Sequence, residues 1–297
     1  MVGIRQILQR RRAVTNISRL TRTMQIVSTA MFKSFYRKWQ TDVDYNDALA
    51  QAGFLLVSRE VPLEHPLLRP ADHGRSAILV IGSRAGLCGG YNAEIWRLLE
   101  AHLQMASAAG KKLDIYASAG RLIQVLNSRG VTPAQVYTDL DDLPSDPQIH
   151  QLAESFVTRY MAGEIDSFSV VYMGFHSTAH QQAQTLTIMP LTDLIGHLFT
   201  TTKVLWPWDQ TFEDFAMSPS PEEIIESLAC MIIHGAIRAC FLNAILSEHV
   251  ARMVAMRTAT KNAEDMVRDL TAHYNRERQT QITGELLDII SGMGVLE

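Results

Sequence analysis

The sequence predicts a small α/β domain between two long helices, one near each end of the chain, that pair as an antiparallel coiled coil. Two observations carry this prediction. Apolar residues recur at alternating steps of three and four in both end segments, and short apolar runs alternate with helical stretches in the middle. The predicted parts are an N-terminal coiled-coil helix over residues 1–57, an α/β domain over 75–203 and a C-terminal coiled-coil helix over 218–297.

The N-terminal segment is strongly basic. The first 41 residues contain nine Arg or Lys and no acid, and the first acid is Asp42. Four interpretations are open: a solvated helix face, a nucleic-acid arm, a mitochondrial presequence, or a helix held among acidic protein surfaces.

The same segment predicts one long helix. No Pro or Gly lies between Gly3 and Gly53, so the helix can reach about 50 residues, or about 75 Å. The predicted apolar seam consists of Ala13, Ile17, Leu20, Met24, Val27 and Met31. A helix of this kind is not stable alone in water, so it needs a partner.

The C-terminal segment supplies that partner. Pro221 suits the first turn of a helix, and Glu222 and Glu223 face the positive end of its dipole. The predicted seam consists of Leu242, Leu246, His249, Met253, Met256, Thr260, Ala263, Val267, Leu270 and Tyr274. A sustained 3.5-residue period indicates a left-handed coiled coil, with packing in an ordinary helical bundle as the alternative.

One stretch of this helix, Leu228 to Leu246, is apolar enough to be considered as a membrane span. His234, Arg238 and Asn243 interrupt it, and each is costly in a bilayer. The stretch therefore predicts a buried helix and no transmembrane segment.

The middle of the chain predicts a largely parallel sheet. The predicted strands are Ala77–Ile81, Leu113–Ala117, Phe168–Met173 and Gln184–Met189, and the predicted helices are near 92–109, 119–129 and 149–164. Strands that alternate with helices of this length are typical of α/β domains.

The first strand runs into a glycine-rich turn, Gly82–Asn92. A turn in this place holds phosphate in nucleotide-binding folds. Neither G-x-G-x-x-G nor G-x-x-x-x-G-K-[ST] is present, so the sequence favours a tight turn whose backbone passes close to another element.

The remaining sequence patterns do not match a catalytic or metal-binding motif. Glu248-His249 lacks the second histidine of a zinc-protease helix, and no G-x-S-x-G elbow is present. Cys88 is interpreted as a buried structural thiol, and an acidic loop as solvated; the loop contains Asp139, Asp141 and Asp142. With Cys230 and Cys240 the cysteines number three and form no C-x-x-C pair, which predicts neither a disulfide framework nor a zinc knuckle. We therefore expect no catalytic, cofactor-binding or metal site.

Composition agrees with a folded domain: 47% of the 297 residues are hydrophobic and 20% are charged. A net charge of −4 gives no global reason to expect nucleic acid or an anionic membrane as partner.

Several segments together resemble the gamma subunit of F-type ATP synthases over nearly the whole chain. They are Met24–Ala30, Gly86–Asn92, Ser247–Met256, Tyr274–Gln279 and Ile282–Leu286. The resemblance implies two terminal helices coiled around each other and a Rossmann-like α/β domain between them. It also implies a non-catalytic central stalk without a cofactor, which couples rotation of the membrane ring to nucleotide-state changes in the catalytic beta subunits.

The implied partners are the hexameric ring of alpha and beta subunits, the epsilon subunit and the membrane c-ring, with no nucleic acid. The residues implied at the coupling interface are Met24, Arg252, Arg278, Gln279 and Thr283. The implied location is the cytoplasmic face of the bacterial inner membrane. This location is preferred because a mitochondrial presequence would be cleaved, and loss of the basic helix would leave the C-terminal seam without its partner. The matrix side of the mitochondrial inner membrane is the alternative.

The chain departs from the family pattern in three places. Arg84-Ala85 stands where the family usually has Asp-Arg, Met31-Phe32 where Lys-Leu is common, and Met293 where Ala is common. Two other functions stay open: a nucleotide-dependent enzyme built on the α/β domain, which would need a phosphate loop, and a nucleic-acid-binding coiled coil, whose affinity would fall steeply with salt.

Overall fold

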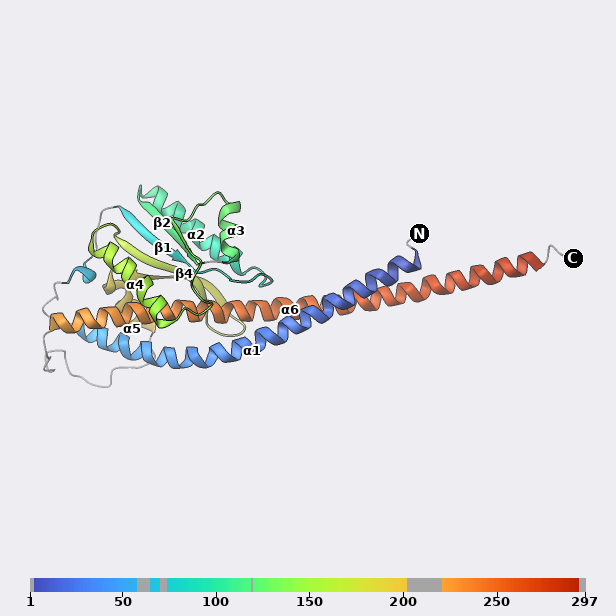
Figure 1. The fold of residues 1–297 in the computed structure, drawn as a ribbon, viewed down its shortest axis with the longest axis horizontal. Coiled ribbons are helices and arrows are strands. Elements are labelled where there is room, and N and C mark those ends of the chain that lie inside the picture. The colour runs from blue at the N-terminus through green and yellow to red at the C-terminus, as the bar shows by residue number, and fades with distance from the viewer. Residues whose placement is uncertain (1–2, 58–64, 70–73, 119, 202–220, 294–297) are drawn as a thin grey trace. The chain divides into compact units, whose positions relative to one another are not determined.

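The computed structural model describes residues 3–57, 65–69, 74–118, 120–201 and 221–293 (Figure 1). The chain forms two compact units. Unit 1 consists of Met1–Ala30 and Arg252–Glu297, and unit 2 of Met31–Ala251. Two helices, α1 (Ile4–Val57) and α6 (Pro221–Met293), each contribute residues to both units. The predicted boundaries at 203 and 218 lie outside the described residues, and the division into three domains stays a prediction.

Unit 2 contains a five-stranded sheet in the order β3-β2-β1-β4-β5. The strands are β1 (Arg75–Val80), β2 (Lys112–Ser118), β3 (Gln135–Tyr137), β4 (Ser167–Phe175) and β5 (Gln181–Met189). The first four run parallel, and β5 pairs antiparallel with β4. The four predicted strands are confirmed. The strand β3 was not predicted, because its three residues are too few to show an alternation of apolar and polar side chains.

Helices cover both faces of this sheet. On one face, α2 (Tyr91–Ala108) and α3 (Arg121–Ser128) pack on alternate residues of β1, Ile78 and Val80. On the other face, Leu79 packs in a second core with α4 (Asp146–Met161), α5 (Leu191–Thr201) and the first part of α6. The three predicted helices correspond to α2, α3 and α4, whereas α5 was not predicted.

The first part of α6 is the central core helix of unit 2. Ile232, Ile233 and Ile237 are at most 1% exposed. By length and composition alone α6 could also cross a membrane, but 61% of its most apolar window is buried in the protein. The burial predicted for residues 228–246 is therefore confirmed.

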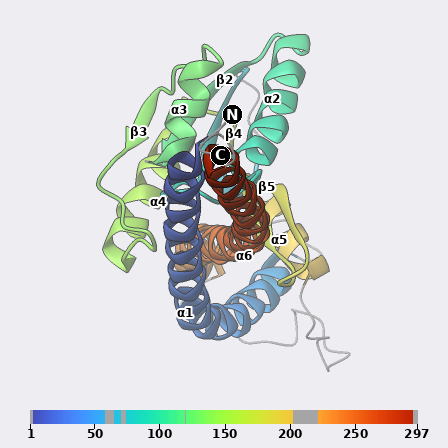
Figure 2. The same ribbon diagram turned by 90° about the vertical axis from the view of Figure 1, so that its right-hand side faces the viewer.

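Unit 1 is an antiparallel helix pair. The hydroxyls of Thr21 on α1 and Thr260 on α6 lie 2.7 Å apart, and Arg22 binds Glu264 at 2.6 Å. The Arg11 guanidinium lies 5.6 Å from the centre of the Tyr274 ring. The residue numbers on α6 rise from Thr260 to Tyr274 as those on α1 fall, which is the predicted antiparallel pairing (Figures 1 and 2).

The seam predicted for α6 is confirmed, since Met256, Thr260 and Ala263 are buried. The seam predicted for α1 is wrong by one residue. Its members Ile17, Leu20 and Val27 are more than half exposed, and Met31 is 46% exposed. The buried side chains are those of Ile7, Val14, Thr21 and Ser28, each seven residues from the next.

The physical reason lies in the size and bonding of the buried side chains. Thr21 and Ser28 are small, and the Thr21 hydroxyl hydrogen-bonds the buried hydroxyl of Thr260. Polar residues can therefore occupy buried positions, and a search for apolar residues alone does not find them. The larger apolar side chains of α1 in unit 1 are left on the surface.

Candidate functional site

Three of the five predicted coupling residues lie together on the last turns of α6. Arg278, Gln279 and Thr283 are exposed, and the Thr283 hydroxyl donates to the Gln279 carbonyl oxygen at 2.9 Å. Arg252 is buried on the same helix, about 39 Å away along its axis at about 1.5 Å per residue. Met24 is half-buried on α1. The structure therefore groups three of these residues and leaves Met24 and Arg252 apart from them.

The end of α6 also carries an exposed apolar surface. Because Arg11 lies against Tyr274, the same antiparallel register brings Ile4 level with about residue 281. The helix continues beyond that point to Met293 (Figure 1). Its apolar side chains there are 44–60% exposed: Ile282, Leu286, Leu287 and Ile289. An apolar helix end of this kind is typical of a surface that another protein covers.

The part of α1 in unit 1 combines positive charge with apolar surface. Its exposed arginines are Arg5, Arg10, Arg12, Arg19 and Arg22. The exposed apolar side chains on this part of α1 are Ile17, Leu20, Ile26 and Val27. The Arg22–Glu264 ion pair is itself exposed, with side chains 64% and 48% accessible, so it contributes little to stability. Such a surface fits an acidic and partly apolar protein partner.

The glycine-rich turn after β1 binds a carboxylate of the chain itself. The backbone N–H groups of Arg84 and Ala85 donate to the two carboxylate oxygens of Glu248 on α6, at 3.0 and 3.3 Å. The Glu248 residue is 7% exposed. Successive N–H groups in a turn can cradle a phosphate, but here they are directed at Glu248.

The strand order reverses between β1 and β4, which is where open α/β sheets bind their ligands. Residues of α6 make contacts on both sides of this point. The Tyr91 hydroxyl donates to the Ala244 carbonyl at 3.1 Å, and the Phe175 N–H donates to the Asn243 side-chain oxygen at 3.3 Å. This helix therefore lies where a nucleotide would lie in an enzyme of this architecture.

Close approaches hold the turn in place, as the sequence predicted. A Cβ on Gly82 would overlap Leu122, and one on Gly120 would lie 2.5 Å from the Ser83 carbonyl oxygen. The Arg121 N–H donates to that same carbonyl at 2.9 Å. Only glycine fits at these two positions without movement of the neighbouring chain.

Arg84 connects the turn to the acidic loop. Its guanidinium binds the Asp142 carboxylate at 2.8 Å and donates to the Leu140 carbonyl oxygen. The interpretation of the loop as solvated is therefore incomplete, because Asp142 is an ion-pair partner. The base at position 84, which departs from the family pattern, is matched by an acid in this chain.

The cysteines are single thiols, and the described acidic side chains form no cluster with metal-ligand geometry. Cys88 is 4% exposed, as predicted for a structural thiol, and its Sγ lies 3.8 Å from the Ala85 carbonyl oxygen. All three cysteines are free. Burial raises the pKa of the Cys240 thiol well above its usual range. Among the described residues, no three His, Cys, Asp or Glu side chains gather in a way that could hold a metal ion.

Two anchoring residues, Glu248 and Arg238, were not predicted from the sequence. Arg238 binds carboxylates on two other elements, Asp42 and Asp146. A signal for Glu248 was present: it is the only acid within the apolar stretch Ala236–Val250, and a buried acid needs a partner. The positions of the partners carried no such signal, because they lie more than 90 residues away in the chain.

Comparison with known proteins gives one consistent result. A family model described as ATP synthase matches residues 3–296. The chain is 33% identical over its whole length to the whole ATP synthase gamma chain of Rhodopirellula baltica. It is also 31% identical to that of Chloroflexus aurantiacus, with 100% of this chain and 99% of the relative covered.

Solved structures agree on the fold. The chain resembles a chain of the Euglena gracilis mitochondrial ATP synthase OSCP/F1/c-ring assembly with a TM-score of 0.64 at 16% identity, over 99% of this chain and 94% of that one. A chain of the rotor of the same enzyme gives a TM-score of 0.62 at 15% identity, over 94% and 98% of the two chains.

Proposed function

The chain belongs to the ATP synthase gamma chain family, and we propose from this that it works as the central stalk of a proton-translocating F-type ATP synthase. Its partners are the alpha and beta subunits of the hexameric ring, the epsilon subunit and the membrane c-ring. The observation that carries the proposal is the helix pair of unit 1, which presents apolar and basic side chains on its outer surface.

The stalk acts by linkage. A rotor that contacts three otherwise equivalent catalytic sites unequally shifts their nucleotide affinities by its differential contact energy with each state. Rotation of the stalk therefore moves each site in turn through its binding states. An asymmetric helix pair with exposed contact residues meets this requirement.

The chain has no catalytic role of its own in this proposal. The place where a nucleotide would bind in the α/β domain holds Glu248 and neighbouring residues of α6, which supports a packing role for the domain. The complex is membrane-associated. The proposed location is the cytoplasmic face of a bacterial inner membrane, supported by bacterial relatives, with the mitochondrial matrix side as the alternative.

Reconstitution tests the proposal. The purified chain is mixed with alpha and beta subunits of a bacterial relative, and the assembled species is analysed by mass and by ATPase turnover. We expect a complex of three alpha, three beta and one copy of this chain, with a gain in ATPase activity. A chain that assembles with none of several such partners, but binds nucleotide or nucleic acid alone, would overturn the proposal.

The coupling contact is proposed to lie at Arg278, Gln279 and Thr283, whose exposure supports a contact with a beta subunit. The variant Arg278→Ala/Gln279→Ala removes hydrogen bonds to a charged group, each worth about 1.5–3 kcal/mol. Each such bond exceeds the roughly 1.4 kcal/mol that corresponds to a factor of ten, so we expect ATP-driven proton pumping per ATP hydrolysed in inverted vesicles to fall at least tenfold. Arg97→Ala, an exposed arginine of α2 outside the helix pair of unit 1, is the control. Equal pumping by the double variant and the wild type would remove these residues from the interface.

A further inference from the structure

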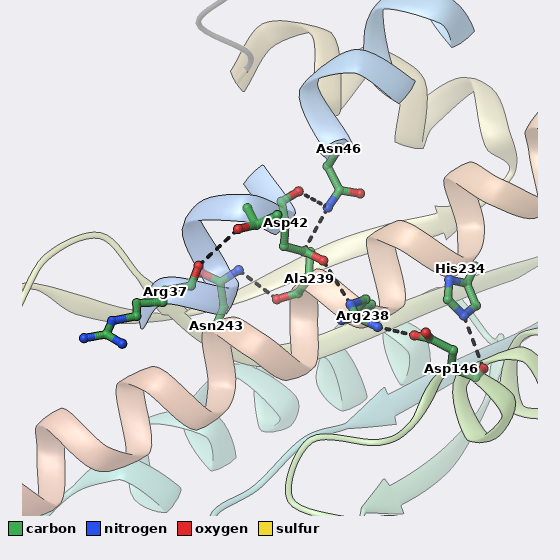
Figure 3. Close-up of polar contacts among 9 residues, drawn as sticks. Arg37, Asp42, Asn46, Asp146, His234, Arg238, Ala239 and Asn243 are labelled. Atoms are coloured by element: carbon green, nitrogen blue, oxygen red, sulfur yellow. Dashed lines mark hydrogen bonds and ion pairs between the residues drawn. The ribbon is translucent and has the colours of Figure 1, made fainter. Parts of the chain in front are cut away.

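Arg238 connects three elements of unit 2 (Figure 3). Its Nε lies 3.1 Å from Asp42 Oδ1 on α1, and its Nη1 binds the Asp146 carboxylate at the start of α4. The His234 Nε2, one turn earlier on α6, lies 3.3 Å from the Asp146 carbonyl oxygen. One guanidinium therefore binds a carboxylate from a long helix and another from the α/β domain.

The groups that Arg238 binds are held in place. The Asn46 side-chain N–H₂ donates to Asp42 Oδ2 at 2.9 Å and to the Asp42 carbonyl oxygen at 2.8 Å. Asp146 begins α4, which has a capping box formed by Ser145 and Gln148. The planar guanidinium fork of an arginine binds its partners in fixed directions as well as at fixed distances, so it positions the elements that carry those partners when both are held.

The two long helices also approach closely at this point. A Cβ on Gly235 of α6 would lie 2.5 Å from the Asn46 Oδ1 and 3.3 Å from the Leu49 Cδ1 on α1. Around this contact the packing is apolar, with Leu49 in the same core as Ile232 and Ile233. Apolar contacts are not directional, so they resist sliding of one helix along the other less than the charged fork does.

The burial of Asp42 indicates that its ion pair with Arg238 contributes little to the free energy of unfolding. Asp42 is 8% exposed, and burial raises the pKa of its carboxyl despite the nearby Arg238 guanidinium. The loss of hydration thus outweighs the attraction to Arg238. Buried ion pairs of this kind contribute little net stability, and their best-attested role is to fix the register of packed elements.

We propose that Arg238 is a positioning residue that fixes α1 and α4 in register on α6, so that the α/β domain and both helices of unit 2 turn as one body. The proposal rests on the proposed function, because only a stalk that transmits torque needs this register under load. Arg238 contacts neither nucleotide nor, in the proposal, another subunit. Its effect is on the transmission of rotation.

The test uses the complete ATP synthase with this chain as its gamma subunit, in inverted vesicles. ATP hydrolysis and ATP-driven proton pumping are measured on the same vesicles, with and without an opposing proton gradient. For Arg238→Met we expect hydrolysis within twofold of wild type and pumping against the gradient at least threefold lower. Asp42→Asn should lower pumping in the same direction, and it serves as the second variant if Arg238→Met assembles poorly. Arg97→Met, an exposed base of α2 within unit 2, is the control.

A reversible disulfide between α1 and α6 distinguishes a loss of helix register from a general loss of folding or assembly. In the Arg238→Met background, Asn46→Cys and Gly235→Cys place two thiols at a close approach of α1 and α6, and Cys230→Ser removes the exposed native thiol. We expect oxidation to restore pumping against the gradient and reduction to return it to the lowered level of Arg238→Met.

The outcomes are distinct. If the wild-type chain hydrolyses ATP without pumping, the proposed function fails. If the wild type pumps, and the Arg238→Met and Asp42→Asn variants pump equally well per ATP under load, the positioning role of Arg238 is overturned. It is also overturned if the oxidised disulfide forms and pumping stays low.

Discussion

A single buried carboxylate, that of Glu248, holds the turn after β1 against α6. Its two oxygens accept from the backbone N–H groups of Arg84 and Ala85. Hydrogen bonds that involve a charged group contribute more than neutral ones, about 1.5–3 kcal/mol each. The contact accounts for the direction of the turn's backbone N–H groups, which face Glu248.

The variant Glu248→Ala tests this contact. Loss of both hydrogen bonds should lower the free energy of unfolding by roughly 2–4 kcal/mol. Urea unfolding followed by tryptophan fluorescence measures the change. Glu226→Ala removes an exposed acid from the same helix and should change the value by less than about 0.5 kcal/mol. A similar small effect for both variants would show that the turn is held by packing alone.

Asp42 predicts a dependence of stability on pH. Because the folded-state pKa of Asp42 is raised above 3.8, the folded chain binds this proton more tightly than the unfolded chain does. Protonation of Asp42 therefore stabilises the fold. This contribution is complete below the pKa of Asp42 in the unfolded chain, and it is lost as the pH rises through the pKa of Asp42 in the folded chain. Arg238 and His234 face the carboxylate and partly offset the effect.

The comparison of wild type with Asp42→Asn isolates this group. As the pH rises from about 4 toward 7, the wild type should lose stability relative to the Asp42→Asn variant. Urea midpoints at several pH values measure the difference. A difference that stays constant with pH, or grows in favour of the wild type, would contradict the raised pKa.

At the scale of elements, the sequence was informative wherever a periodic pattern was long. The sustained seam of α6 gave the correct buried face, and four apolar runs gave four strands. In α1 the apolar period indicated a face one residue away from the buried one, because Thr21 and Ser28 fill the contact and Ile17 and Leu20 do not. Periodicity finds an apolar stripe, but it does not tell whether the chain itself or a partner covers that stripe.

A pair of truncations on α1 tests the corrected seam. Val14→Ala removes two methyl groups from a side chain in the helix contact and should cost roughly 1–2 kcal/mol. Leu20→Ala removes more apolar volume from a side chain that is 60% exposed, and should change stability by less than about 0.5 kcal/mol. Thermal melting by circular dichroism on the isolated chain distinguishes the two. A larger loss for Leu20→Ala would restore the seam read from the sequence.

At the scale of the whole molecule, the fold class and the family followed from the sequence, but the anchoring contacts did not. The fork of Arg238 joins residues 196 positions apart, and Glu248 joins α6 to a turn 164 positions away. Local patterns carry no information about such pairs. The placement of Arg278 and Gln279 came from a resemblance to a family motif, and both side chains are exposed although α1 still runs alongside α6 at this level.

The pairing of Thr21 with Thr260 has a consequence for biosynthesis. The two residues are 239 positions apart, so a ribosome that adds about 5–20 residues per second exposes Thr21 roughly 12–48 s before its partner is made. During that interval the first helix has no α6 to pair with, and a lone helix is only marginally stable in water. Unit 1 therefore forms only after translation of α6, and the nascent N-terminal segment has no helix partner within the chain until then.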